Sequence, residues 1–383
     1  MTIPFNRPSF VGHEREYMEA ALANGHISGD GKFSAACSRI LAEVVGGHRV
    51  LLTTSGTHAL EMAAMLLSPA AGAAPEEPQA EVIVPAFTFT STANAFLVHG
   101  MRPVFADIRP DTLNIDETDL ERVLSERTRA VSVVHYAGVG CDMEPIQRFC
   151  TKHGLSLVED NAHGLFGTHL GRPLGSFGRF AALSFHETKN ITCGEGGALI
   201  VRDAADVERA EYIREKGTNR SQFFRGAVDK YTWVDVGSSY LPSDLLAAIL
   251  YAQLEARETI QARRHAIWER YFVELAPWAR TNEVALPVVP DSCRHPAHMF
   301  HLVMPTAAAR DGLIAHLRQL GIGAVFHYIP LDTSPVGQRL GVVPGMCPVA
   351  ASVSERLVRL PFFYELLGED LDTVIAAVTR FAV

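Results

Sequence analysis

The sequence lacks the features of several large classes of protein. Its six cysteines are scattered and include no Cys-x-x-Cys pair, which argues against a disulfide scaffold or a cysteine metal site. No apolar run approaches the roughly 18–20 residues of a membrane span, and residues 1–10 lack the apolar core of a signal peptide. We therefore expect a soluble, cytoplasmic protein without a membrane partner.

Basic residues and common catalytic motifs are also scarce. The 34 Lys and Arg are outnumbered by 43 Asp and Glu, and the formal net charge of -9 argues against general nucleic-acid binding, although it allows a local site for one diphosphate. There is no Gly-x-Ser-x-Gly elbow, P-loop or complete Gly-x-Gly-x-x-Gly turn. His295 and His298 flank a proline and have no carboxylate cluster beside them, so no metal site is predicted.

What the sequence contains is an alternation of strand and helix patterns. Short apolar runs alternate with segments whose apolar residues have helical spacing. This alternation predicts an α/β fold with a mostly parallel sheet, helices on both faces and ligands at the carboxyl ends of the strands. The predicted strands are residues 50–53, 81–84, 103–107, 130–134, 155–159 and 180–183, and the predicted helices are residues 14–24, 33–45, 58–67, 91–99, 116–126, 143–153 and 204–216.

The pattern changes after residue 216. A polar, basic loop reaches residue 233, and residues 243–278 form one long helical pattern that we expect to be broken or bent. We predict a large domain at residues 1–245 and a small C-terminal α/β domain at residues 246–383. Further expected elements are a surface loop at 69–79, strands at 300–304 and 324–326, and helices at 307–320, 348–357 and 370–380.

Lys189 is the first candidate for chemistry. It lies between the apolar run at residues 180–183 and a glycine cluster at residues 194–197, just beyond a predicted strand. Burial there would lower the pKa of its ammonium group, and the free amine could then attack carbonyl carbons. Taken alone, a solvated loop lysine is the commoner interpretation, because lysines are rarely buried.

Two other strand ends supply what such a lysine needs. Asp160 ends the run at residues 155–160, and the turn Ser55-Gly56-Thr57 follows the run at residues 49–53. A site for pyridoxal 5'-phosphate (PLP) needs a lysine that forms a Schiff base, a carboxylate that keeps the pyridinium nitrogen protonated, and helix-start N–H groups for the phosphate. Glu159 could compete with Asp160, but strand alternation puts the two side chains on opposite faces.

At these residues the sequence resembles the DegT/DnrJ/EryC1/StrS family of sugar aminotransferases, essentially from end to end. It is most similar to the branch that acts on dTDP-4-keto-6-deoxy-D-glucose. The similarity to that branch is carried by Ile-Pro-Phe-Asn-Arg-Pro at residues 3–8 and by Arg-Glu-Lys-Gly-Thr-Asn-Arg-Ser-Gln-Phe-Phe-Arg-Gly at residues 214–226. The resemblance implies a fold type I PLP-dependent transferase, working as a homodimer with shared active sites.

The resemblance also implies roles for individual residues. Lys189 would form the Schiff base and move protons, and Asp160 would pair with the ring nitrogen. Phe87 would stack on the ring, with Phe89 as its local competitor. At Ser239 the family usually carries an asparagine that crosses the dimer interface to the phosphate, and the usual Asn-Tyr-Arg pattern is absent here. The implied cofactor contacts are Ser55, Gly56, Thr57, Phe87, Asp160, His163, Ser184, Lys189 and Ser239.

Substrate contacts are implied in two places. His327 and Tyr328 match the motif that closes over the substrate. Arg220, Arg225 and Lys230 form a basic patch that could pair with the diphosphate of a sugar nucleotide, although a solvated loop explains these charges equally well.

The reaction that the resemblance implies uses two small-molecule substrates. L-glutamate would give its amino group to C4 of dTDP-4-keto-6-deoxy-D-glucose, which yields a dTDP-4-amino-4,6-dideoxyhexose and 2-oxoglutarate. One alternative is amination at C3 of a dTDP-3-keto-6-deoxyhexose. A second alternative is a non-catalytic sugar-nucleotide sensor, and the presence of Lys189, Asp160 and Ser184 together argues against it.

Overall fold

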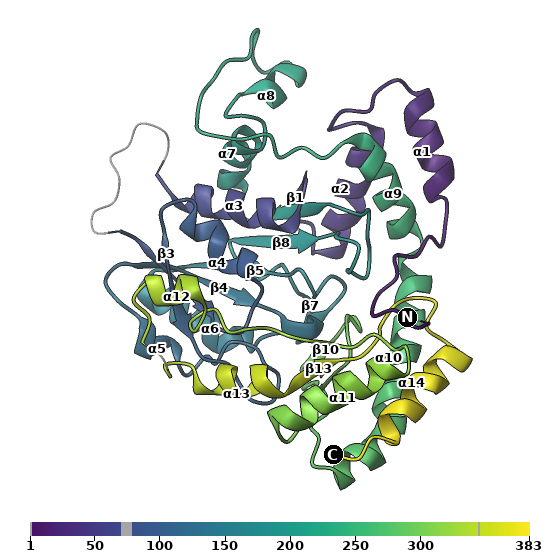
Figure 1. Cartoon of the computed structure of the whole chain (residues 1–383). Helices are drawn as coiled ribbons and strands as arrows, with labels where there is room; N and C mark the ends of the chain where they lie inside the picture. Colours follow the sequence, from purple (N-terminus) through teal and green to yellow (C-terminus); the bar gives the residue numbers. More distant parts are fainter. Residues whose placement is uncertain (1, 70–78, 344) are drawn as a thin grey trace.

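A seven-stranded sheet forms the centre of the large domain (Figure 1). The structure, a computed structural model, describes residues 2–69, 79–343 and 345–383. The strands of this sheet are β1 (Arg49–Thr53), β2 (Glu81–Pro85), β3 (Arg102–Ala106), β4 (Thr128–Val134), β5 (Ser156–Asp160), β8 (Phe180–Ser184) and β9 (Gly197–Val201).

The order of the strands across the sheet is β1-β9-β8-β5-β4-β2-β3. From β8 to β3 neighbouring strands are parallel, whereas β9 is antiparallel to both β8 and β1. The mostly parallel sheet of the predicted α/β fold is therefore confirmed. Because all the strands except β9 point the same way, β1, β2, β4, β5 and β8 end at one edge, where the loops that follow them meet.

Helices cover both faces of this sheet, so its strands are apolar on both faces. On one face, Leu51 and Val84 pack against α3 and α4, and on the other Leu52 and Ile200 pack against α2 and α9. The helices of this domain are α1 (Glu14–Ala23), α2 (Lys32–Val44), α3 (Gly56–Leu67), α4 (Thr90–Leu97), α5 (Leu120–Val123), α6 (Met143–His153), α7 (Ala204–Arg214), α8 (Arg220–Phe224) and α9 (Asp244–Glu255).

A second apolar core lies in the C-terminal part, where Tyr271, Phe300 and Val374 are buried together. The N-terminal segment joins it, since Ile3 belongs to this core. The elements of the C-terminal part are α10 (Arg257–Thr281), β11 (His301–Val303), α11 (Ala307–Gln319), β12 (Val325–Phe326), α13 (Pro348–Arg356), β13 (Leu357–Arg359) and α14 (Glu369–Thr379). The remaining short elements are the 3-10 helix η1 (Tyr136–Gly138), β6 (Thr168–His169), β7 (Arg172–Pro173), β10 (Cys293–Arg294) and α12 (Pro335–Arg339).

The long helical pattern at residues 243–278 is broken, as expected. The break falls at Ala256, where ψ is 4°, between α9 and α10. Because α9 packs on the large sheet and α10 belongs to the second core, we propose that the domains divide at Ala256, later than the predicted boundary after residue 245.

One predicted helix was wrong, and the strands β6, β7, β9, β10 and β13 were not predicted. Residues 116–126 contain only the single turn α5, because Asp116 accepts a 2.9 Å hydrogen bond from the N–H of Thr118 and Asp119 accepts one of 2.8 Å from the N–H of Asp107. Such local side-chain bonds compete with a helix. The antiparallel strand β9 was not predicted, and most of the loop predicted at residues 69–79 lies outside the described residues.

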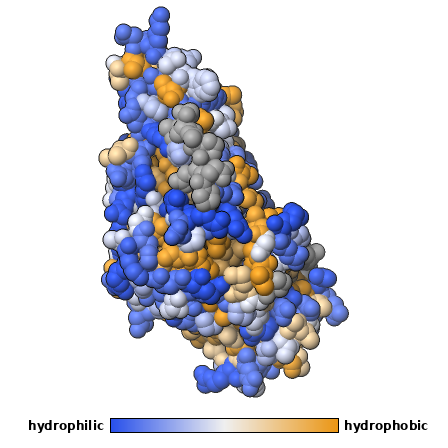
Figure 2. Space-filling view, turned by 90° about the vertical axis from the view of Figure 1, so that its left-hand side faces the viewer, coloured by the Kyte–Doolittle hydropathy of each residue, from blue (hydrophilic) through white to orange (hydrophobic). Residues whose placement is uncertain are grey.

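Figure 2 shows the side of the molecule that lies at the left of Figure 1. Hydrophilic residues cover most of this side, and hydrophobic residues gather near its centre. The narrow upper extension, which carries α8, also exposes hydrophobic residues. Phe224, in α8, and Trp233, between α8 and α9, are 68% and 77% exposed. Within the described ranges, no helix has both the length and the apolar character needed to cross a membrane.

Candidate active site

The strand ends enclose a cavity of about 570 Å³ between the two domains. Its walls come from the starts of α3 and α4, the ends of β5 and β8, and the segment around β12 and β13 of the small domain. Nine of the residues predicted from the sequence lie on these walls: Ser55, Gly56, Thr57, Asp160, His163, Ser184, Lys189, His327 and Tyr328.

Lys189 lies in the turn that follows β8. Its backbone N–H donates to the carbonyl of His186 at 2.9 Å, and its side chain is partly buried in the cavity wall. Burial lowers the pKa of the Lys189 ammonium to about 8, and the Arg359 charge acts in the same direction while Asp160 opposes it. At this pKa about a tenth of the amine is unprotonated at pH 7, and that fraction is available as a nucleophile.

Asp160 ends β5 and faces the same cavity. One carboxylate oxygen accepts a 2.7 Å hydrogen bond from the Thr92 hydroxyl, and the other accepts a 3.2 Å bond from the N–H of Ala162. Burial raises the pKa of Asp160, although these hydrogen bonds and the Lys189 charge oppose the shift. Asp160 is thus a buried carboxylate that a cationic ligand would stabilise.

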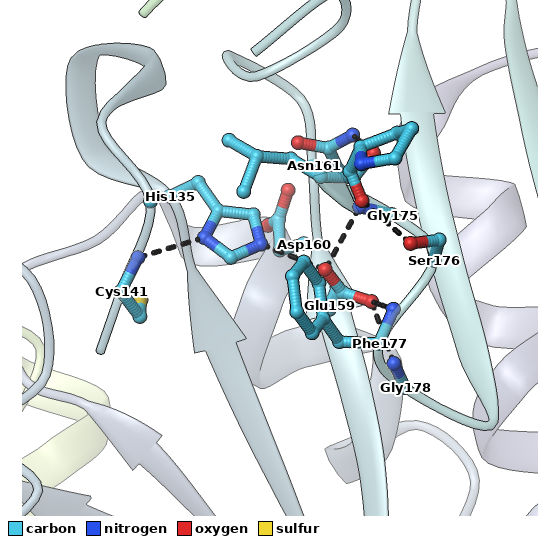
Figure 3. Close-up of polar contacts among 12 residues, drawn as sticks. His135, Cys141, Glu159, Asp160, Asn161, Gly175, Ser176, Phe177 and Gly178 are labelled. Atoms are coloured by element: carbon cyan, nitrogen blue, oxygen red, sulfur yellow. Dashed lines mark hydrogen bonds and ion pairs between the residues drawn. The ribbon is translucent and has the colours of Figure 1, made fainter. Parts of the chain in front are cut away.

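Glu159 points to the opposite side of β5 (Figure 3). It accepts hydrogen bonds from His135 Nε2 at 2.9 Å and from the N–H groups of Gly175, Phe177 and Gly178 at 2.8, 2.7 and 2.6 Å. Burial alone would raise the pKa of Glu159, but the contacts of His135, Gly178 and Gly175 outweigh it and hold the pKa below its usual value. Glu159 is therefore satisfied by the protein itself.

The start of α3 forms the third part of the site. Ser55 is the N-cap, and its hydroxyl accepts a 3.1 Å hydrogen bond from the N–H of His58. The first N–H groups of a helix have no partners within it, and the helix dipole favours an anion there. Gly56 allows this helix start to approach β8, because a Cβ at position 56 would lie 2.9 Å from the Cβ of Ser184.

These residues fit PLP on structural observations that do not depend on the family resemblance. A partly neutral lysine and a buried carboxylate face one cavity, and an anion-binding helix start lies on the same wall. Within the described part of the chain, the Nδ1 atom of His163 is also buried without a hydrogen-bond partner. A buried polar atom of this kind is costly unless a ligand satisfies it.

The aromatic ring on the cavity wall is not the one that the resemblance favoured. Phe87, which the resemblance favoured, is 1% exposed and lies outside the cavity wall, where its ring centre is 5.6 Å from that of Tyr328. Phe89 lies on the wall and is 57% exposed. The chain leaves the strand after Pro85 and bends at residues 86–88, and Phe89 is the N-cap of α4, so the bend and not strand alternation gives the two rings different surroundings. Phe87 therefore supports Tyr328 from behind, and Phe89 is the ring available to a ligand.

Four other predicted residues lie away from this cavity. Ser239, Arg220 and Arg225 line a separate cavity of about 1080 Å³ beside α2 and α7, and Lys230 is exposed outside both cavities. Arg220 pairs with Glu215 at 2.5 Å, and Arg225 pairs with Glu211 at 2.7 Å. Within one chain the structure therefore does not bring the basic patch to Lys189.

Three further residues of the cavity region were not predicted as site residues. Thr92 was missed because nothing in the sequence marks its hydrogen bond to Asp160. His298 stacks on His163, with ring centres 4.3 Å apart. Arg359 donates to Nε2 of His327 at 3.1 Å. His298 and Arg359 come from the small domain, far from Lys189 in sequence, so only the fold shows that they belong to the site.

Comparisons with known proteins agree with this geometry. Residues 9–379 match the DegT/DnrJ/EryC1/StrS aminotransferase family. The spore coat polysaccharide biosynthesis protein SpsC of Bacillus subtilis (strain 168) is 32% identical over 384 residues, which cover 98% of this chain and 96% of SpsC.

Two solved structures show the same fold along the whole chain. The aminotransferase TlmJ of Streptoalloteichus hindustanus has a TM-score of 0.87 at 28% identity, and the alignment covers 98% of each chain. PseC of Helicobacter pylori, an aminotransferase involved in the biosynthesis of pseudoaminic acid, has a TM-score of 0.86 at 25% identity, with 99% of this chain and 98% of PseC covered.

Fold and site together define a PLP-dependent aminotransferase of fold type I. The chain belongs to the DegT/DnrJ/EryC1/StrS aminotransferase family. Its relatives support the further statement that it is a sugar aminotransferase, which takes an amino group from a donor and gives it to a sugar.

Proposed function

We propose that this enzyme transfers the amino group of L-glutamate to C4 of dTDP-4-keto-6-deoxy-D-glucose. The observation that carries the transamination is the position of Lys189 and Asp160 on one cavity wall together with the start of α3. The choice of sugar is supported by the resemblance of residues 3–8 and 214–226 to the branch that uses this substrate. The sugar-related names of SpsC and PseC agree with a sugar as acceptor.

The residues that would hold PLP lie at separate positions along the cavity. Bound PLP supplies an electron sink for the carbon that carries the amino group. Asp160 would keep its ring nitrogen protonated, and the N–H groups at Ser55, Gly56 and Thr57 with the Ser184 hydroxyl would hold its phosphate. Phe89 would cover one ring face, and His163 would meet the ring edge near its phenolic oxygen.

Lys189 would anchor the cofactor and then act as the general base and acid. Its amine, with a pKa of about 8, is close to the working pH, which is the condition for moving a proton in both directions. Thr92 keeps the Asp160 carboxylate oriented toward the cavity through their 2.7 Å hydrogen bond. His327 and Tyr328 would close the cavity over the substrate from the small domain.

The proposal includes a homodimer with shared sites. Phe223, Phe224, Tyr231 and Trp233 are exposed in the segment between α7 and α9, where a second copy could cover them. Ser239, Arg220 and Arg225 line the separate cavity of the same region and would reach a neighbour's site only in such a dimer. Sedimentation of the purified protein tests this part, and a monomer at working concentration would contradict it.

The substrate is tested with two purified keto sugars. We expect L-glutamate and dTDP-4-keto-6-deoxy-D-glucose to give a dTDP-4-amino-4,6-dideoxyhexose and 2-oxoglutarate, identified by mass and by NMR of the ring protons. Lys189→Ala should abolish the product. Faster amination of the dTDP-3-keto isomer would reject the C4 assignment, and full activity of Lys189→Ala would reject the mechanism.

A further inference from the structure

His298 presents one nitrogen of its imidazole ring to the cavity without a protein partner. The residue lies in the segment between β10 and β11, lines the cavity and is 4% exposed. Within the described ranges no donor forms a hydrogen bond with its Nε2 atom, and this atom is not one of the fully buried polar atoms that lack a partner. The Nε2 atom therefore opens onto the cavity, where a ligand can reach it.

Asn190 determines which ring nitrogen of His298 carries the proton. The Nδ2 group of Asn190 donates to the carbonyl oxygen of Pro296 at 2.7 Å and to Oε1 of Gln261 at 3.2 Å, so its Oδ1 remains as an acceptor. This oxygen lies 2.9 Å from Nδ1 of His298, which is therefore the protonated nitrogen. A neutral imidazole with its proton on Nδ1 has a lone pair on Nε2, so the atom that faces the cavity is a hydrogen-bond acceptor.

The surroundings of His298 keep its ring neutral and fixed. Burial lowers the pKa of His298 well below its usual value, and the charge of Lys189 acts in the same direction. The ring stacks on that of His163, with the centres 4.3 Å and the planes 18° apart. Arg264 donates to the carbonyl oxygens of Ala297 and His298 at 3.0 and 2.6 Å and so holds the backbone. The acceptor thus keeps one position and one protonation state near neutral pH.

A fixed acceptor of this kind selects a ligand group that donates. L-glutamate offers two carboxylates, which only accept hydrogen bonds, and one amino group, which is the reacting group itself. The keto sugar offers hydroxyl groups, each of which can donate to a lone pair. With PLP bound, the amine of Lys189 is taken up by the cofactor and is not a standing donor. Of the two proposed substrates, the sugar is therefore the one that matches Nε2 of His298.

We propose that Nε2 of His298 accepts a hydrogen bond from the C3 hydroxyl of the keto sugar, an assignment that rests on the proposed amination at C4. His298 lies close enough to Lys189 to feel its charge, so the group that His298 binds is near the reacting carbon. Of the two carbons bonded to C4, C3 carries a hydroxyl, whereas C5 carries the ring oxygen and the C6 methyl group. His298 thereby selects keto sugars by the hydroxyl next to the carbon that is aminated.

Calorimetry on the PLP-loaded protein measures this hydrogen bond without turnover, because the keto sugar takes an amino group only from the aminated form of the cofactor. The wild type should bind dTDP-4-keto-6-deoxy-D-glucose about tenfold more tightly than its 3-deoxy analogue, dTDP-4-keto-3,6-dideoxy-D-glucose. His298→Phe keeps an aromatic ring beside His163 but has no acceptor, so it should bind the two sugars equally. Equal binding by the wild type, or a tenfold preference that persists in His298→Phe, would overturn the proposal.

Two further variants separate the hydrogen bond from packing. His298→Gln offers a side-chain oxygen as an acceptor and should recover a preference of about threefold. His265→Phe is the matched control, because His265 lies on α10 outside the cavity, with its ring centre 5.3 Å from that of His295, and this variant should keep the full preference. Loss of the preference in His265→Phe would show that packing of the small domain sets it. Thermal unfolding of each variant confirms that folded proteins are compared.

The two half-reactions show which substrate uses His298. In His298→Phe, the reaction of the PLP form with L-glutamate, followed by loss of the PLP absorbance band, should change by less than about twofold. For the aminated form, KM for the keto sugar should rise about tenfold while kcat changes little. Equal slowing of both half-reactions would mean that His298 serves Lys189 and not the sugar, and would overturn the proposal.

Failure of this proposal can be told apart from failure of the proposed function. If the wild type aminated only the dTDP-3-keto isomer but still bound the 4-keto sugar more tightly than its 3-deoxy analogue, and lost this preference in His298→Phe, the C4 assignment would be wrong and the hydroxyl site would stand. If the wild type aminated C4 while the C3 hydroxyl made no difference to binding, the hydroxyl site would be wrong and the proposed function would stand.

Discussion

Glu159 and Asp160 are adjacent carboxylates on one strand, and their surroundings differ in nearly every respect (Figure 3). Glu159 accepts four hydrogen bonds from His135 and the loop after β7, and its pKa is held below the usual value. Asp160 accepts two, from Thr92 and Ala162, and burial raises its pKa. The pair shows that burial alone does not mark a functional carboxylate.

The two carboxylates differ in where their hydrogen-bond partners come from. The protein itself supplies every partner that Glu159 needs, so its charge holds the loop from Gly175 to Gly178 against the end of the sheet. Asp160 keeps a face toward the cavity and lacks a full set of partners. A carboxylate that remains incomplete in the folded chain is the one that can stabilise a bound cation, and we propose that this cation is the ring nitrogen of PLP.

We expect the largest loss of activity when the charge of Asp160, the carboxylate that faces the cavity, is removed. Asp160→Asn keeps the shape but leaves no anion for the ring nitrogen, and we expect kcat/KM for transamination to fall about 10³-fold. The free energy of unfolding, measured with urea, should change little, because the buried charge was costly. Retention of most activity would show that Asp160 does not serve the cofactor.

Glu159→Gln should show the reverse pattern. An amide cannot accept from all four donors, so we expect the protein to lose about 2–4 kcal/mol of unfolding free energy. Activity per folded molecule should stay within a few-fold of wild type. A large loss of activity without loss of stability would contradict the structural role of Glu159.

The unfolding free energy that Glu159→Gln loses should also depend on pH. The pKa of Glu159 is lower in the folded protein, so its charge stabilises the fold above the usual carboxyl pKa of about 4.3 and loses this effect as the pH falls through the lower, folded-state pKa. Urea unfolding of wild type and Glu159→Gln should therefore differ most near neutral pH and converge in acid. A difference that is independent of pH would mean that packing, not charge, causes it.

A smaller effect is expected from the residue that orients Asp160. Thr92→Val removes one hydrogen bond to the carboxylate, worth roughly 1 kcal/mol, so cofactor affinity should fall by about tenfold or less. Thr88→Val is the matched control, because the Thr88 hydroxyl lies 2.8 Å from that of Thr92 and has no bond to Asp160. Equal effects of the two variants would show that packing around α4 decides the result.

Much of this site could be predicted from sequence because its parts lie at strand ends. Lys189, Asp160 and the turn at Ser55 each follow an apolar run, and a parallel sheet brings such ends to one edge. Strand alternation likewise separated Glu159 from Asp160 correctly. Alternation cannot choose between Phe87 and Phe89, because residues two apart share one face of a strand and the chain bends at residues 86–88.

The parts that could not be predicted depend on contacts between distant segments. Arg359, His298 and Phe5 reach the cavity region only because the N-terminal segment and the small domain pack beside the large sheet. Single-sequence patterns describe local periodicity and carry no information about such contacts. The helix expected at residues 116–126 failed for a related reason, because side-chain bonds of Asp116 and Asp119 replaced the helical ones.

The roles proposed for the other residues of this site depend on Lys189 being the lysine that binds PLP. The most direct measurement is the absorbance spectrum of the purified chain with PLP, before and after L-glutamate, followed by borohydride reduction and peptide mapping. We expect a cofactor band that L-glutamate removes, and a reduced cofactor attached to Lys189. No band, or a cofactor attached to another residue, would show that Lys189 does not bind PLP.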